Sequence, residues 1–163
     1  MSRSLIIASL LAISSSGLAD ARLPPKEHWI TYGGDFNQRH AMDTSSVRRK
    51  GDLASFRYLV IGRKGPMKTD KGPVAYIIDE FVMDCAKRVE TIARADFYDR
   101  SGKRLRSRLF PNNDWSPSTS EVSRVFRRYA CDGATGKAEY ESLDALLQQT
   151  FGWWANAKAM NPR

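Results

Sequence analysis

Two histidines and two cysteines are the side chains of this sequence best suited to hold a metal or to act as nucleophiles. His28 follows Glu27, and such a pair could bind a metal or move a proton. His40 lies twelve residues further along the chain, and no HExxH motif is present. Because this spacing lacks a zinc-ligand pattern, imidazoles on the surface or at a strand edge are the favoured interpretation, and no metal or cofactor is predicted.

Three acidic residues, Asp79, Glu80 and Asp84, lie close together in the middle of the chain. On a strand, Glu80 and Asp84 share a face and could form a carboxylate pair, although solvated carboxylates and ion pairs with arginines are commoner. Segment 62–69 fails as a phosphate-binding loop, since Met67 stands where that loop requires a glycine. A GxSxG motif is also absent, so we predict that the protein is not an enzyme.

Lysine and arginine give the strongest chemical signal, because 26 of them stand against 18 acidic residues and leave a net charge of +8. A positive excess of this size favours anionic partners. Three basic groups are regularly spaced, on a predicted strand, on one face of a predicted helix and in a predicted loop. They are Arg104, Arg106 and Arg108, then Arg124, Arg127 and Arg128, then Lys64, Lys68 and Lys71.

If the strand and helix groups adjoin, they form an anion-binding patch suited to lipopolysaccharide phosphates, heparin-like sugars or nucleic acid. The alternative is an ordinary solvated exterior, since charges on the outer face of a sheet are common. Of the anionic partners, nucleic acid is not expected, because no stacking aromatic residues interleave with the arginines.

The first 21 residues, MSRSLIIASLLAISSSGLADA, have the features of a secretory signal peptide. A single early arginine precedes an apolar run over residues 5–13, and Ala19-Asp20-Ala21 ends the segment. The apolar run is shorter than the roughly 20 residues needed to span a bilayer. We therefore predict cleavage after Ala21 and export to the periplasm, the cell surface or the medium, with no lipid anchor.

An exported protein is in an oxidising environment. Cys85 and Cys131, the only two cysteines, are therefore most simply interpreted as one disulfide. Such a bond closes a loop of roughly 45 residues and contributes on the order of 4 kcal/mol by restricting the unfolded chain. A catalytic thiol or an intermolecular bond remains as an alternative. Neither cysteine lies in a CxxC motif or beside a histidine, which disfavours the catalytic thiol.

The secondary-structure elements that position these groups are predicted to be strands in the first part of the chain and helices in the last part. Aromatic and β-branched runs bounded by turn residues predict strands over 29–32, 45–49, 53–61, 74–85, 90–98 and 103–110, with a basic Gly-Pro loop over 64–73. On the last strand, period-2 alternation places the three arginines opposite Leu105 and Leu109. Strands that follow one another without crossover helices indicate an antiparallel sheet of about five or six strands.

Two helices follow the strands. Ser118 and Glu121 have capping-box spacing and predict a helix that opens at 117–120, and a second helical stretch runs over 137–149. The predicted fold class is therefore α+β, with one helix packed on the sheet and a C-terminal helical tail. The adjacent Trp153 and Trp154 could touch a membrane interface or a partner, but docking on the protein's own sheet is favoured, because paired indoles rarely stay in water.

An ordered set of short motifs resembles a known family. The set is Trp29 at the first strand, Asp43-x-x-Ser46-Val47, Asp84-Cys85, Tyr98-Asp99-x-x-Gly102, Trp115 with Pro117-Ser118, and Cys131. It is similar to the surface-adhesin protein E-like domain of Gram-negative bacteria over residues 29–131. The resemblance implies a small secreted module with a curved antiparallel sheet, a packed helix and a cysteine pair.

These observations divide the chain into a signal peptide (1–21), a surface-adhesin protein E-like domain (22–131) and a helical tail (132–163). We expect an exported, non-enzymatic binding protein whose basic surfaces contact host or other extracellular-matrix-type anionic ligands. The alternative is a soluble periplasmic envelope factor that binds anionic lipid or polysaccharide.

Overall fold

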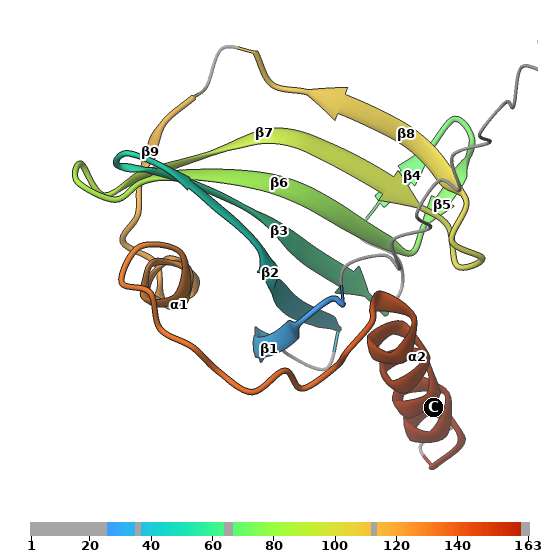
Figure 1. Ribbon diagram of the computed structural model, residues 1–163. Coiled ribbons are helices and arrows are strands. Elements are labelled where there is room, and N and C mark those ends of the chain that lie inside the picture. Colours follow the sequence, from blue (N-terminus) through green and yellow to red (C-terminus); the bar gives the residue numbers. More distant parts are fainter. Residues whose placement is uncertain (1–25, 35–36, 64–66, 112–113, 161–163) are drawn as a thin grey trace, which may run out of the picture.

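An antiparallel sheet with one helix on each face forms the structure. The computed structural model describes residues 26–34, 37–63, 67–111 and 114–160. The predicted signal peptide with its cleavage site at Ala21, and Lys64 of the predicted basic loop, lie outside these residues. Strands pair in the order β1-β2-β3-β6-β7-β8, with β9 on β7, and the sheet curves into an open arch (Figure 1). The predicted α+β class is confirmed.

The sheet consists of β1 (Trp29–Gly34), β2 (Gln38–Lys50), β3 (Leu53–Gly62), β6 (Tyr76–Asp84), β7 (Val89–Tyr98), β8 (Arg104–Leu109) and β9 (Ser116–Pro117). A separate hairpin contains β4 (Met67–Thr69) and β5 (Gly72–Val74), and the helices are α1 (Glu121–Ala130) and α2 (Leu143–Met160). Segment 64–73, expected as a loop, thus carries most of this hairpin. The strand expected over 45–49 is the end of the longer β2.

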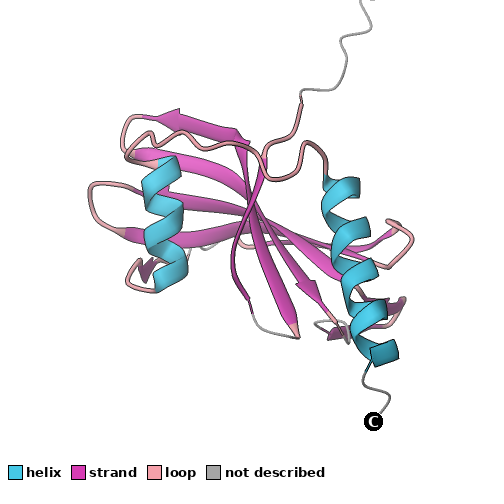
Figure 2. Cartoon of the chain, turned by 90° about the horizontal axis from the view of Figure 1, so that it is seen from below, coloured by secondary structure: helices cyan, strands magenta, loops and turns pink. Residues whose placement is uncertain are grey.

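Apolar residues lie on both faces of the sheet, and a different helix covers each face. On β3, Ala54, Phe56 and Tyr58 join the cluster under α1, whereas Leu59 and Ile61 join the cluster under α2. Successive side chains of a strand point to opposite faces, which explains this division. Seen from below, the two helices lie on opposite sides of the strands (Figure 2).

The N-cap of helix α1 lies two residues after the serine that the capping-box spacing predicts. This N-cap is Ser120, whose Oγ accepts a hydrogen bond of 2.9 Å from the backbone N–H of Ser123. The predicted cap, Ser118, instead donates its backbone N–H to the carbonyl of Arg88, because the preceding β9 pairs with β7. Strand pairing therefore holds residues 116–118 extended and delays the helix.

The disulfide Cys85–Cys131 is confirmed, and its Cα atoms are 5.6 Å apart. It joins the end of β6 to the end of α1. From there the chain crosses the edge of the sheet at β1, where Trp29 exchanges backbone hydrogen bonds with Tyr140. A second helix was expected over 137–149, but its predicted start is wrong, because this pairing holds the chain extended at Tyr140. Helix α2 begins at Leu143 and continues to Met160.

Candidate anion-binding surfaces

The first predicted basic group lies on β8, the free edge of the sheet. Arg104, Arg106 and Arg108 are all exposed, and β8 has β7 as its strand neighbour. Of the two leucines that alternate with these arginines, Leu105 is buried, whereas Leu109 is 70% exposed. A register shift at Leu105 interrupts the regular alternation, because Tyr98 pairs with Arg104 and Phe97 with Arg106.

The three β8 arginines differ from other arginines of the sheet in their partners. Among the described residues, no ion pair joins them to a carboxylate, whereas Arg57 pairs with two and Arg94 with one. Arg108 holds its guanidinium 4.6 Å above the ring of Phe110. An arginine without an acidic partner keeps its donors available for an anionic ligand.

The second basic group lies on α1, in a different part of the fold. Arg124 and Arg128 are exposed, and Arg127 is 4.0 Å from a carboxylate oxygen of Asp132. Helix α1 packs on β1, β2 and β3, and three strand spacings, about 14 Å, separate β3 from β8. The structure therefore places the α1 arginines apart from the β8 arginines.

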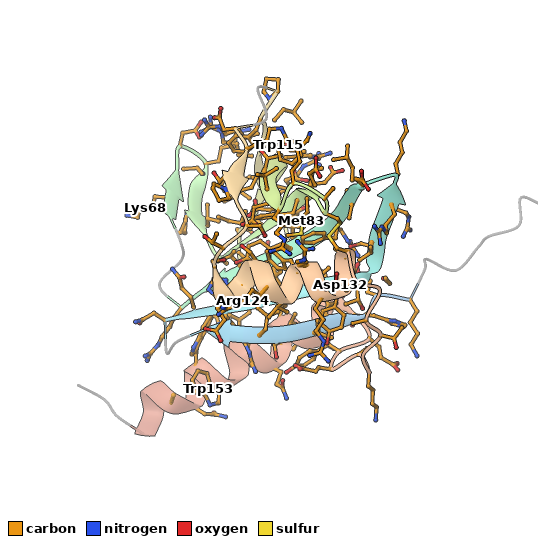
Figure 3. All side chains as sticks on the ribbon, turned by 90° about the vertical axis from the view of Figure 1, so that its left-hand side faces the viewer. Lys68, Met83, Trp115, Arg124, Asp132 and Trp153 are labelled. Atoms are coloured by element: carbon orange, nitrogen blue, oxygen red, sulfur yellow. A yellow bond between two sulfur atoms is a disulfide. The ribbon has the colours of Figure 1, made fainter. Side chains whose placement is uncertain are left out.

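The third basic group lies on the β4–β5 hairpin, where the structure describes Lys68 and Lys71. Lys68 and Lys71 are both exposed. Figure 3 shows Lys68 on the hairpin and Arg124 on α1, well separated in that view. The hairpin packs beside β8, since Val74 of β5 shares a buried cluster with Leu105. Of the three groups, the hairpin and the β8 arginines are therefore the two that lie near each other.

An ion cluster on the α2 face was not recognised in the sequence. Asp43 is fully buried and pairs with Arg57, which also reaches Glu27 at 2.7 Å. Burial acts to raise the pKa of Asp43, but hydrogen bonds from Ser45 and Arg57 outweigh it and hold the pKa below its usual value. Ser46 accepts the backbone N–H of Arg57 at 2.8 Å. The Asp43-x-x-Ser46 motif thus joins β2 to β3.

Two of the groups considered for metal or acid–base chemistry, Glu27 and Asp84, accept hydrogen bonds within the fold. Glu27 accepts hydrogen bonds from Trp29 Nε1 at 3.0 Å and from the backbone N–H of Leu143 at 2.6 Å. The described residues contain no cluster of three or more metal-ligating side chains. Asp84 accepts the backbone N–H groups of Ala86 and Lys87 and so stabilises the β6–β7 turn, whereas Glu80 is exposed.

A polar row crosses the α1 face next to the aromatic cluster. Asp79 is 7% exposed and lies opposite Tyr58, whose hydroxyl is 2.6 Å from His40 Nδ1. Burial raises the pKa of Asp79 to about 7. From the sequence, Asp79 is recognisable only as one of three neighbouring acidic residues. Which face of the sheet Asp79 lies on, and therefore whether it is buried, depends on the strand register.

The C-terminal helical tail packs on the sheet, which is the position that the sequence analysis favours for Trp153 and Trp154. Trp154 is 5% exposed and belongs to the cluster under α2, while Trp153 remains 50% exposed. The favoured docking is therefore confirmed for Trp154. Within the described residues, neither helix combines the length and apolar character that a membrane span requires.

Comparison with known proteins agrees with this architecture. The family model described as Surface-adhesin protein E matches residues 29–132. The match begins at the first residue of β1 and ends one residue after Cys131, so that it includes α1 and leaves α2 outside. No curated protein and no solved structure matches the chain.

Proposed function

Because the chain belongs to the surface-adhesin protein E family, we propose that it is an exported, non-enzymatic binding protein that holds anionic polymers along β8. The family suggests a secreted or surface location and an adhesin-like role. The polymer class that fits this surface is a sulfated or phosphorylated polysaccharide, such as a heparin-like glycan. We assign the contact to Arg104, Arg106 and Arg108.

The observation that carries this proposal is the state of the β8 arginines: exposed, and without a carboxylate partner among the described residues. Alternate residues of a strand are about 6.7 Å apart, so an edge strand presents its charges in an extended row. A polymer with repeated anionic groups can meet several of them at once. Guanidinium groups bind sulfate and phosphate oxygens through charge-assisted hydrogen bonds.

The test is the salt concentration that elutes the protein from immobilised heparin. We expect the triple variant R104A/R106A/R108A to elute at clearly lower salt than the unmodified protein. The matched control, K50A/K87A/K137A, removes the same three charges at exposed positions away from β8 and keeps most of the retention. Equal losses in the two variants would show that retention reflects net charge alone and would overturn the assignment to β8.

A second variant separates the two arginine groups. R124A/R127A/R128A removes the charges of α1, which packs mainly on β1, β2 and β3. We expect this variant to elute close to the lysine control. A loss as large as that of the β8 variant would contradict a binding surface confined to β8.

Surface location has its own test. Protease added to intact cells is expected to degrade the protein if it is displayed outside. Protection in intact cells, with degradation after the outer membrane is permeabilised, would contradict surface display and would support the periplasmic alternative, an envelope factor that binds anionic lipid or polysaccharide.

A further inference from the structure

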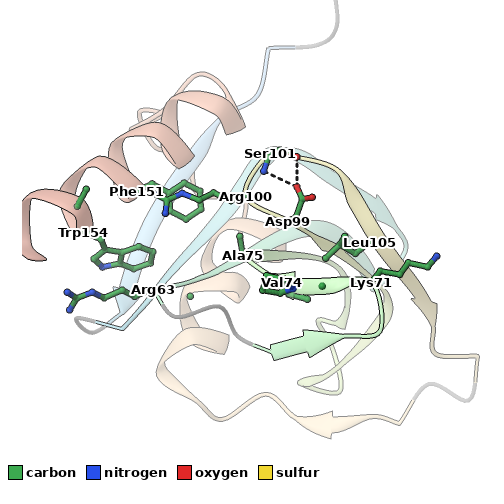
Figure 4. A pocket seen from close by; sticks show the side chains of 14 residues that line it. Arg63, Lys71, Val74, Ala75, Asp99, Arg100, Ser101, Leu105, Phe151 and Trp154 are labelled. Carbon is green, nitrogen blue, oxygen red and sulfur yellow. Dashed lines mark hydrogen bonds between the residues drawn. The ribbon is translucent and has the colours of Figure 1, made fainter.

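A cavity of about 670 Å³ opens at one end of the sheet, between the β4–β5 hairpin, the β7–β8 turn and α2 (Figure 4). Its lining comes from four segments that are far apart in the sequence, 62–63, 71–75, 99–105 and 151–155. Cavities that hold small molecules in proteins have volumes of about 300–1,000 Å³. The cavity is therefore large enough for a ligand of ordinary small-molecule size.

The inner wall of the cavity is apolar. Val74 is fully buried, and Leu105 and Trp154 are 6% and 5% exposed. Phe151 lies beside Trp154, with ring centroids 6.1 Å apart. An acyl chain or ring that enters here replaces water at carbon surfaces, and each buried methylene contributes about 0.8 kcal/mol.

The rim of the cavity is cationic. Arg63, Lys71 and Arg100 line it, and the Arg100 guanidinium lies 4.7 Å above the ring of Phe151. Among the described lining residues the one carboxylate is Asp99, which accepts hydrogen bonds from the backbone N–H groups of Ser101 and Lys103 and from the Ser101 hydroxyl. Asp99 is thus engaged by its own turn, and the rim keeps a positive excess.

A buried donor at the inner wall is also unpaired. Trp154 Nε1 has no hydrogen-bond acceptor among the described residues, although the side chain is 95% buried. A buried indole N–H usually finds a partner, and leaving it without one is unfavourable. The nitrogen is enclosed by protein, so it takes no part in the ligand binding proposed below.

From this combination we propose that the cavity binds a single-chain amphiphile with an anionic head group. The chain packs on Leu105, Phe151 and Trp154, and the carboxylate or phosphate head lies among the cations of the rim. Fatty acids and single-chain lipid phosphates share this chemistry. The site uses none of the β8 arginines and is independent of the polysaccharide surface.

Calorimetric titration of protein purified after expression of the full chain tests the proposal. The probes are dodecanoate and dodecyl phosphate, each below its micelle concentration, with dodecanol as the uncharged analogue. We expect both anions to bind one site per chain, and dodecanol to bind at least about tenfold more weakly, because it lacks the charge. The tighter of the two anions identifies the preferred head group. Equal affinity for dodecanol would overturn the anionic-head assignment.

Two matched helix variants locate the site. Ala155 lines the cavity and is exposed on α2, so A155W is expected to fill the cavity and weaken binding at least about tenfold. Ala145 is an exposed residue of the same helix outside the lining, and A145W is expected to bind like the unmodified protein. Unchanged binding by A155W would place any amphiphile site elsewhere and overturn the proposal.

Charge variants complete the test. K71A/R100A is expected to weaken binding of dodecyl phosphate about tenfold and to leave dodecanol unchanged, whereas K50A/K137A leaves both unchanged. R104A/R106A/R108A is expected to keep amphiphile binding, and A155W to keep heparin retention. Because each variant set has its own readout, failure of the cavity proposal and failure of the β8 proposal are distinguishable.

Discussion

The two faces of the sheet are stabilised in different ways. On the α1 face, Phe126 inserts among Tyr32, Phe56, Tyr58 and Phe81, with ring centroids 4.9 to 5.4 Å from its own. The disulfide then fixes the end of this helix to the end of β6. On the α2 face, the helix covers the cluster around Trp29, and the ion cluster of Glu27, Asp43 and Arg57 lies beside it.

This difference separates the covalently fixed part of the fold from the part with room for ligands. The helix inside the family match is held by rings and a disulfide, whereas the helix outside it is held by packing and by the backbone hydrogen bonds of Tyr140. The hollow proposed for amphiphiles is lined by α2, and a further hollow of about 610 Å³ lies over the ion cluster. The disulfide thus fixes the helix of the α1 face, whereas both hollows adjoin α2 or the residues just before it.

The largest expected effect comes from removing the disulfide on the α1 face. C85A/C131A releases a loop with a sequence separation of 46 residues, and the expected loss in free energy of unfolding is about 4 kcal/mol. Denaturant unfolding followed by circular dichroism measures it. L146A, which truncates a fully buried residue of α2, is the comparison on the other face. A disulfide effect below about 1 kcal/mol would contradict the view that α1 depends on this bond.

The next effect tests the ion cluster on the α2 face. D43N removes the charge that pairs with Arg57, and we expect a loss of about 2–3 kcal/mol at pH 7, because the charge-assisted hydrogen bonds of this buried group are weakened while Arg57 keeps Glu27 as a partner. Since the folded pKa of Asp43 is depressed, its contribution is present above about pH 4 and is lost as pH falls through the folded pKa. D43N should therefore lose this part of the acid dependence. An unchanged profile below pH 4 would assign the sensitivity to other carboxylates.

How far the sequence predicts these features depends on whether they are local. Strands β3 and β6 were recognisable because aromatic and β-branched residues form continuous runs between turns. The start of α2 was not, because residues 137–142 have helical periodicity while Tyr140 pairs with the distant Trp29. A backbone partner more than 100 residues away leaves no trace in local spacing.

The candidate surfaces show the same limit. The β8 arginines are exposed, as are all residues of this edge strand except Leu105, so their alternation with leucine alone does not set their exposure. Their separation from the α1 arginines depends on strand order, and the bulge at Leu105 depends on pairing with β7. The cationic cavity is built by four distant segments, so no single stretch of sequence indicates it.

A smaller effect of opposite sign is expected from the polar row on the α1 face. The pKa of Asp79 is raised to about 7 by burial, so the folded protein keeps this proton between about pH 4 and 7 while the unfolded chain releases it. Its contribution to stability therefore falls as pH rises through that range. D79N should remove this decline and raise the free energy of unfolding at pH 8 by on the order of 2 kcal/mol.

Unfolding of D79N and the unmodified protein at pH 5 and pH 8 measures this effect. His40, Tyr58 and Glu90 also face the α1 side of the sheet, and they are the same in both proteins. Asp43 and Asp79 thus form a matched pair: Asp43 has a cationic partner, and Asp79 has none among the described residues. A loss of stability at pH 8 in D79N would contradict the assignment of Asp79 as an unpaired buried acid.

The smallest effect compares the first turns of the two helices. Ser120 caps α1, and the hydroxyl of Ser142 accepts the backbone N–H of Ala145 at the start of α2. Replacing such a residue by alanine typically costs about 1 kcal/mol. S120A should cost more than S142A, because Ser120 also contacts the hydroxyl of Ser123, which donates to Glu90 at 2.7 Å and so connects α1 to β7. Equal losses would show that the two caps act locally, and that the closer attachment of α1 comes from its rings and disulfide alone.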